Sequence, residues 1–331
     1  MPERVQGPHA GASWRGASWL PLLLATVVGG LVMSLVNDRF ATSYNLFVVL
    51  QEAATYALIG FAVMVVLAVR DLSLAVGGIG SLCCVTFGWL VDPLGLPVVV
   101  GIVVALLLGL VLGLVNGVLI TASGLSGFVV TLASGATFTG LALGATKSAA
   151  FSAIPGAWTA FGQGRFGLVP YLGLVALGVG LLLHALFRWL PAGRAMLTTG
   201  GNPEAARLVG ISNVRQIVGA HALSGLLAAL AAVLYVGRLG SATPDLGANW
   251  VILSFAVPII GGTAMLGGRV SVAGALIAAV VLAGINNALI LLNVSQYGVL
   301  FSQGLLILLA VLAGRLQGVG ALAGRTRQVA A

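Results

Sequence analysis

The sequence is poor in charge. Of its 331 residues, 15 are Lys or Arg and 7 are Asp or Glu, so 7% of the chain is charged, against about 25% in a soluble domain. So few charges cannot cover the surface of a 33.3 kDa water-soluble protein, which excludes a soluble enzyme or a secreted domain. Disorder is excluded as well, because 60% of the residues are hydrophobic and disordered chains have few apolar residues.

The shortage of reactive residue types excludes most catalytic chemistry. Cys83 and Cys84 are adjacent inside an apolar run and form neither a disulfide framework nor a metal pattern. No two of the three histidines have ligand spacing: His9, His184 and His221. Lys147-Ser148 fails the phosphate-loop pattern because Thr146 precedes the lysine. We expect no enzyme activity and no cofactor in this chain, so any ATP and Mg²⁺ would be bound by another polypeptide.

Long apolar runs are what the sequence does contain, with a mean hydropathy of +1.13. A membrane-spanning helix needs about 20 apolar residues. We predict an all-α, polytopic helical membrane protein with about ten spans: 18–36, 46–69, 72–91, 97–121, 127–146, 168–190, 214–236, 250–266, 270–292 and 297–314. Residues 1–17 and 315–331 would be cytoplasmic tails on either side of a transmembrane domain at 18–314. Span 250–266 holds Pro258 and Gly261-Gly262, so it is a full crossing or a re-entrant segment.

The basic residues predict an orientation. A net charge of +8 can indicate nucleic-acid binding, but the basic residues lie between apolar runs, which favours orientation by positive charge on the cytoplasmic side. With both termini in the cytoplasm, four basic residues lie outside and the other eleven inside. The four outer residues are Arg39, Lys147, Arg165 and Arg238. We therefore expect a multi-pass protein of the bacterial inner membrane, in contact with lipid and not with nucleic acid.

Glycines and a faint repeat predict how the spans pack. Gly109, Gly113 and Gly117 share one helix face, which lets a second helix approach closely. Residues 111–120 align with 281–290, 170 residues later, at five of ten positions, and Asn116 matches Asn286. The paired spans would run in opposite directions, and inverted repeats of this kind are typical of transporters.

Neutral polar residues inside the spans are the candidates for a translocation path. Amides and hydroxyls exchange hydrogen bonds with a solute without the desolvation cost of a charge, although each can also join two helices. These candidates are Asn116, Thr131, Asn286, Asn287 and Gln303. Glu52 is the ionisable residue placed within a span, either as a path-lining carboxylate or as an interfacial residue near the outer end of its span. One acid argues against a proton-coupled transporter.

The segment 191–213 is the longest predicted cytoplasmic loop and contains a capped short helix. Asn202 is its N-cap, Pro203 takes the first helical position, Glu204 lies in the first turn and Gly210 ends it. Ala205, Leu208 and Val209 share a small apolar face, and Arg207 lies near the end that favours a cation. Such a helix suits docking into a partner's groove or serves as an ordinary connector.

A resemblance favours docking. The run from Gly193 to Ile211, with Gly200-Gly201-Asn202 and Glu204 to Leu208, resembles the coupling loop of the ribose-type permeases of bacterial ABC importers. Further motifs are similar and in family order: Asp71-Leu72-Ser73 with Gly77, Gly113 to Gly117, Phe128 to Leu132, Ser224 to Ala231, Gly261-Gly262-Thr263 with Gly267 to Arg269, and Asn286-Asn287. Two stretches depart from the family pattern, Ala68-Val69-Arg70 and 247–254, where the Glu expected near Val251 is absent.

The resemblance implies the permease subunit of an ABC importer for a monosaccharide or a related polar solute. It implies a second permease copy, cytoplasmic ATPase subunits that contact residues 202–210, and an outer solute-binding protein. Other classes stay open. A secondary transporter predicts uptake under an ion gradient without an ATPase, and a channel predicts flux without a binding protein. Nucleobases, nucleosides, the autoinducer-2 signal and polyols are the rival solutes of an ABC permease.

Overall fold

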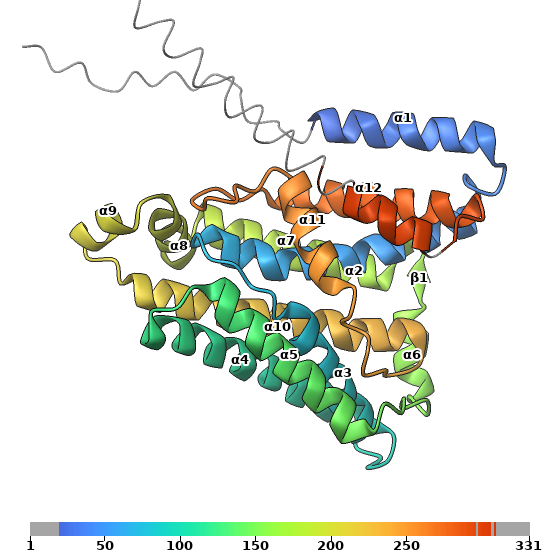
Figure 1. The fold of residues 1–331 in the computed structure, drawn as a ribbon. Helices are drawn as coiled ribbons and strands as arrows, with labels where there is room; N and C mark the ends of the chain where they lie inside the picture. The colour runs from blue at the N-terminus through green and yellow to red at the C-terminus, as the bar shows by residue number, and fades with distance from the viewer. Residues whose placement is uncertain (1–19, 296, 306–307, 309–331) are drawn as a thin grey trace, which may run out of the picture.

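The computed structural model describes residues 20–295, 297–305 and 308, and the predicted tails lie outside these ranges. The helices over the predicted spans are α1 (Leu20–Val36), α2 (Ser43–Ala68), α3 (Val76–Val91), α4 (Val98–Ser123), α5 (Gly127–Thr146), α7 (Tyr171–Arg188), α10 (Asn213–Leu239), α11 (Trp250–Ile260) and α12 (Val272–Leu291). Residues 297–305 are helical as well. The remaining elements are α6 (Gly156–Gly162), α8 (Pro191–Gly201), α9 (Pro203–Leu208) and the antiparallel pair β1 (Arg165–Phe166) and β2 (Val169–Pro170). Figure 1 shows a helical bundle with α1 at its edge.

Among the residues that the structure describes, six helices are long and apolar enough to cross a membrane: α2, α4, α5, α7, α10 and α12. The apolar helices at 26–36, α3 and α11 are shorter. The prediction of a helical span over 250–266 is wrong in its extent, because α11 ends at Ile260. Eleven residues rise only about 16 Å, and Pro258 with the left-handed Gly262 (φ +85°) stops the helix there.

The start of the third span also differs from the prediction. Helix α3 begins at Val76 and not at residue 72. Arg70 has a φ of +64°, which ends the turn after α2, and residues 71–74 continue without helical structure. Both α3, with 16 residues, and α11, with 11, are therefore shorter than a full span, and each follows a non-helical stretch of chain.

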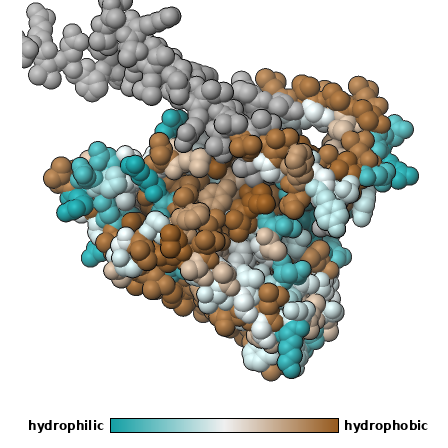
Figure 2. Space-filling model, viewed as in Figure 1, coloured by the Kyte–Doolittle hydropathy of each residue, from teal (hydrophilic) through white to brown (hydrophobic). Residues whose placement is uncertain are grey.

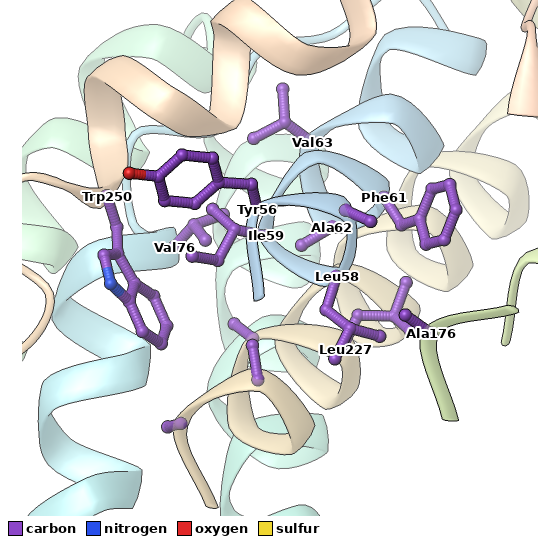
Figure 3. Packing of buried hydrophobic residues seen from close by; sticks show 14 of the residues in the cluster. Tyr56, Leu58, Ile59, Phe61, Ala62, Val63, Val76, Ala176, Leu227 and Trp250 are labelled. Carbon is purple, nitrogen blue, oxygen red and sulfur yellow. The ribbon is translucent and has the colours of Figure 1, made fainter. Parts of the chain in front are cut away.

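Helix α2 forms the centre of the bundle. Most of its length is buried, and it contacts α7, α10, α11 and α12. Figure 3 shows its side chains pointing to several sides, with Leu58 toward Leu227 and with Phe61 directed away from Tyr56 and Trp250. A helix that is apolar all round belongs in the interior, whereas α4, α5 and α7 keep one exposed apolar face.

The glycine face of α4 packs closely on α10, as predicted. A Cβ on Gly109, Gly113 or Gly117 would overlap Gly225, His221 or Val218 of α10 respectively. The pairing also fixes direction, because residue numbers rise along α4 while they fall along the facing side of α10. The two helices are antiparallel.

The inverted relation between the two halves of the chain is confirmed. At one end of α2 the Asn45 amide pairs with that of Asn287 at 2.8 Å, and at the other end Gly268 N donates to Ala68 O just before α12 begins. Helices α2 and α12 are therefore antiparallel, and α2 and α4 point opposite to α10 and α12. The repeat pairs α2 with α10, α3 with α11, and α4 with α12.

The two short helices α3 and α11 meet inside the bundle. Gly77 at the start of α3 packs backbone to backbone against Gly247, which precedes α11, and Gly247 N donates to Ser81 Oγ at 3.0 Å. Gly80 leaves room for the Trp250 ring. Broken helices at the contact between inverted repeats are where transporters place their solute sites.

The two ends of the bundle differ in charge. The segments at the α8–α9 end carry six basic residues of the described chain, Arg70, Arg188, Arg194, Arg207, Arg215 and Arg269, whereas the opposite end carries four, Arg39, Lys147, Arg165 and Arg238. Hydrophilic residues gather over α8 and α9 at the left of Figure 2 and again at its right margin, with hydrophobic side chains between them. This arrangement is expected of a protein that crosses a bilayer.

Candidate functional site: a polar cavity between the repeats

A cavity of about 510 Å³ lies at the end of the bundle opposite α8 and α9. Its walls come from α2, α10, α11, α12 and the helical residues 297–305, and thus from both halves of the chain. This volume lies within the range of about 300–1,000 Å³ typical of small-molecule sites. The lining includes Glu52, Tyr56, Tyr235, Arg238, Asn249, Trp250, Asn286 and Gln303.

A chain of polar contacts runs along one wall of the cavity. Glu52 Oε1 accepts hydrogen bonds from Tyr56 Oη at 2.5 Å and from Asn286 Nδ2 at 2.6 Å. Gln303 Nε2 donates to Asn286 Oδ1 at 3.5 Å. From the described residues, no hydrogen bond reaches Glu52 Oε2. This oxygen is therefore available to accept a hydrogen bond from a bound molecule.

Aromatic rings and one cation lie beside aliphatic side chains in the rest of the lining. Trp250 and Tyr235 pack edge to face with their centroids 6.2 Å apart, and Figure 3 places Tyr56 and Trp250 on the same side of α2. The Arg238 guanidinium lies 5.7 Å from the centroid of the Tyr235 ring and makes no ion pair within the described part of the chain. The cavity thus combines apolar ring surfaces with both donors and acceptors.

The structure brings together two of the residues expected on a translocation path and separates the others. Asn286 and Gln303 line the cavity. Asn287 faces away and bonds Asn45. Thr131 accepts from Leu74 N at 2.9 Å and so holds the non-helical chain before α3.

Asn116 is buried on α4, and neither atom of its amide has a partner among the described residues. It lies in a different wall of the bundle from Asn286, although the repeat pairs the helices that carry them. Whether Asn116, Thr131, Asn286 and Asn287 contact solute stays a prediction.

Sequence reasoning singled out Glu52, Asn286 and Gln303 but missed the other polar and aromatic residues of the cavity: Tyr56, Tyr235, Arg238, Asn249 and Trp250. Glu52 lines the cavity, and whether it contacts a solute stays a prediction. Tyr56 lies one helical turn further on, and the (i, i+4) spacing of acid and phenol was a signal available in the sequence. No local pattern in the sequence indicated Tyr235, Arg238 and Trp250, because these residues reach the cavity only through the packing of α10 and α11.

The capped helix forms as predicted at the other end. Asn202 Oδ1 accepts from Glu204 N at 3.1 Å and from Ala205 N at 3.0 Å, Pro203 is the first helical residue, and Gly210 (φ +81°) follows the end of α9. Leu208 and Val209 are 89% and 70% exposed. The sequence did not predict α8, which precedes α9 and begins with Pro191.

A pair formed by the buried His221 and the partly buried Asp71 lies near the α8–α9 end. Asp71 Oδ2 is 2.9 Å from His221 Nε2, and Asp71 Oδ1 accepts from Leu72 N at 2.8 Å. Gly127 at the start of α5 has room only for hydrogen against this carboxylate. The pair therefore ties the chain before α3 to α10 and α5.

The fold and the cavity define a class: a polytopic transport protein built from inverted repeats. Residues 45–311 match the family described as "Branched-chain amino acid transport system / permease component", and the chain belongs to this permease family. It is a transport permease subunit and a multi-pass protein of the inner membrane.

Three relatives illustrate the range of the family. The ribose import permease protein RbsC of Bacillus subtilis is 35% identical over 86% of this chain and 89% of its own length. The Escherichia coli K12 RbsC is 33% identical over 88% of this chain and 91% of its own length. The D-allose transport system permease protein AlsC of the same strain is 30% identical over 89% of this chain and 90% of its own length. No solved structure matches the chain.

Proposed function

We propose that this chain forms the translocation path for a monosaccharide in an ABC importer. Its similarity to ribose and D-allose import permeases over most of both chains carries the proposal. The cavity supports it, because its lining joins neutral amides and hydroxyls with aromatic rings, and such groups suit a solute that carries hydroxyls on an apolar ring.

Cytoplasmic ATPase subunits would supply the energy by docking on α9, and they would hold the ATP and Mg²⁺. The well-capped helix and the exposed Leu208 and Val209 support this docking, because exposed apolar side chains on a rigid helix fit a partner's groove. The α8–α9 end and both termini would then face the cytoplasm. The excess of basic residues at that end agrees with the positive-inside rule.

A second copy of the chain and an outer solute-binding protein would complete the importer. The apolar faces of α5 and of residues 297–305 remain exposed, with Phe128, Leu132, Leu141, Phe301 and Leu305. Such faces contact lipid or another copy. The mass of the solubilised complex distinguishes one copy from two.

Uptake by reconstituted complexes tests the proposal. The chain is placed in proteoliposomes with the ATPase and binding protein encoded beside it, and uptake of radiolabelled ribose, fructose and allose is measured with ATP present or absent. ATP-dependent uptake of at least one of these sugars is expected. Uptake by the chain alone under an ion gradient would indicate a secondary transporter. Flux without a binding protein would indicate a channel, and uptake of nucleosides only would reassign the solute.

A further inference from the structure

Three segments of the chain meet backbone to backbone beside α9. They are the last turn of α8, the last residue of α2 and the loop before α12, and Figure 1 shows all three at the α8–α9 end of the bundle. A Cβ on Gly200 of α8 would overlap both the Ala68 carbonyl oxygen and the Gly268 nitrogen, and Gly268 N donates to Ala68 O at 3.2 Å. A displacement of α8 is passed on here through backbone atoms, which cannot rotate aside as a side chain can.

The loop before α12 is held in one shape. Ala264 N donates to Arg269 O at 3.0 Å and closes the loop on itself. Gly267 and Gly268 have φ angles of +82° and +76°, a conformation that glycine adopts without strain. This turn places the Gly267 backbone against the Gly200 carbonyl oxygen, so α8 contacts a rigid segment of chain and not a flexible one.

Asn202 joins α8 to α9 without an intervening loop. Its N–H donates to Thr198 O at 3.0 Å and caps the end of α8, while its side chain accepts from Glu204 N and Ala205 N and caps the start of α9. One residue that caps both helices leaves no flexible segment between them. A force on α9 therefore reaches Gly200, which lies in the last turn of α8.

The two helices that leave this contact meet again at the cavity. Helix α2 ends at Ala68 and carries Glu52, and α12 follows Gly268 and carries Asn286. Asn286 Nδ2 donates to Glu52 Oε1 at 2.6 Å in the cavity wall. Because α2 and α12 belong to different halves of the repeat, a single contact at the α8–α9 end reaches both halves.

We infer that Gly200 is a positioning residue for transport: the backbone joint of Gly200, Ala68 and Gly268 transmits a displacement of α9 to α2 and α12, and so moves the cavity wall. This inference rests on the proposed docking of ATPase subunits on α9. It adds the route by which their movement reaches the cavity, whichever solute the cavity holds. Gly200 itself touches neither ATP nor solute.

Two neighbouring glycines give a matched pair of substitutions. Gly200→Ala places a methyl group on the Ala68 carbonyl and should loosen the joint, whereas the Cβ of Gly201→Ala would lie 3.9 Å from Gly268 Cα, an ordinary contact. In the importer reconstituted with its ATPase and binding protein, both variants should keep co-purification of the ATPase, because α9 is unchanged. Uptake of radiolabelled ribose, fructose or allose per ATP hydrolysed should fall at least severalfold in Gly200→Ala and stay unchanged in Gly201→Ala.

A cysteine reporter on α12 follows the transmitted movement. Ile290 lines the cavity and is exposed, so Ile290→Cys is accessible to a small thiol reagent, while the native Cys83 and Cys84 are buried. In the assembled importer in nanodiscs, a non-hydrolysable ATP analogue is expected to change the labelling rate of Ile290→Cys. The analogue should have no effect when Gly200→Ala is added, and its full effect when Gly201→Ala is added.

Hydrogen exchange of the unsubstituted importer tests the joint without any variant. The Gly268 amide is bonded to Ala68 O within the joint, and a joint that moves as one body keeps this bond. The Gly268 amide should therefore be protected from exchange both with the ATP analogue and without nucleotide. Free exchange of this amide in either state would show that the joint opens and would overturn the inference, even if Gly200→Ala does not fold.

The outcomes separate the inference from the proposed function. If Gly200→Ala keeps full uptake per ATP, or keeps the response of Ile290→Cys to the analogue, the joint does not transmit and monosaccharide import still stands. Loss of ATPase co-purification in Gly200→Ala would show that Gly200 serves docking, which also contradicts the inference. If the unsubstituted importer takes up no sugar with ATP present, the proposed function itself fails.

Discussion

The role of a polar residue in this bundle depends on its partner and not on its type. Asn286 and Asn287 are adjacent, yet the helical turn of 100° between them directs one amide to Glu52 in the cavity and the other to Asn45 on α2. Thr131 bonds a backbone amide, and Asn116 bonds nothing among the described residues. Neutral polar residues that look alike in the sequence thus divide into solute candidates and structural contacts.

Asn116→Leu and Asn286→Leu should have different effects. A buried amide without partners loses its hydrogen bonds to water and gains none in the protein. Asn116→Leu should therefore keep or raise the melting temperature in detergent. Asn286→Leu removes a bond to Glu52 and should reduce sugar uptake at least severalfold without preventing membrane insertion. Uptake and thermal melting of both variants check this. Normal uptake by Asn286→Leu would remove Asn286 from the translocation path.

The Asp71–His221 pair should matter for stability. Asp71→Leu leaves the buried His221 and the Leu72 amide without their partner, which costs about 1–3 kcal/mol for each unsatisfied group. The melting temperature should fall by several degrees, and less in Asp71→Asn, which retains an acceptor oxygen. Equal melting temperatures for Asp71→Leu and the unsubstituted protein would contradict this role.

At the scale of elements, glycine faces and broken helices determine how the bundle closes. Backbones approach closely at Gly113 and Gly225, and the short helices α3 and α11 meet at Gly77 and Gly247. Each contact lies between the two halves of the repeat. The 11-residue α11 and the non-helical chain before it both contribute to the lining of the cavity, through Trp250 and Asn249 among others.

Gly225→Ala should separate α10 from α4. The added methyl group would overlap the Gly109 carbonyl and the Gly113 backbone, and backbone atoms cannot move aside as a side chain can. We expect a large loss of thermal stability. Gly140→Ala on α5 is the control, because nothing lies within 4 Å of its Cβ position, and alanine there should be neutral or stabilising by up to about 1 kcal/mol. Similar melting temperatures for the two variants would refute close packing.

Substitutions in α9 should uncouple the importer without unfolding it. Ala205→Glu adds a bulky charge to an exposed position, and Glu204→Lys reverses the charge in the first turn, so both should reduce co-purification of the ATPase and solute-stimulated ATP hydrolysis. Arg215→Gln, an exposed change outside α9, is the control. If both variants assemble with the ATPase and hydrolyse ATP normally, α9 is not the coupling contact. The segment 70–73 is then the next candidate for contact with the ATPase.

For the whole molecule, the distribution of basic residues predicts how it sits in the membrane. A cysteine at Ser212, next to α9, should be protected from a membrane-impermeant thiol reagent in intact cells, and one at Ala157 on α6 should be labelled. Both positions are exposed, so a difference in labelling reports the side of the membrane. Labelling at Ser212 but not at Ala157 would reverse the orientation.

The sequence alone determined the elements whose causes are local. Apolar length and turn residues placed α5 at 127–146, and the capping groups Asn202 and Pro203 placed α9. These features depend on hydrogen bonds and side chains within a few residues of one another. The alignment of residues 111–120 with 281–290 also indicated the repeat, and the predicted spans indicated that the paired helices run in opposite directions.

Only the tertiary structure decided where the short helices α3 and α11 begin and which polar groups meet. Residues 71–74 and 241–249 are stabilised outside helices by distant contacts, such as Thr131 with Leu74 N and Ser81 with Gly247 N. Glu52 and Asn286 are 234 residues apart and bond because α2 and α12 pack antiparallel. A cavity is what several packed surfaces leave unfilled, so its lining is a property of the whole bundle and not of any single segment.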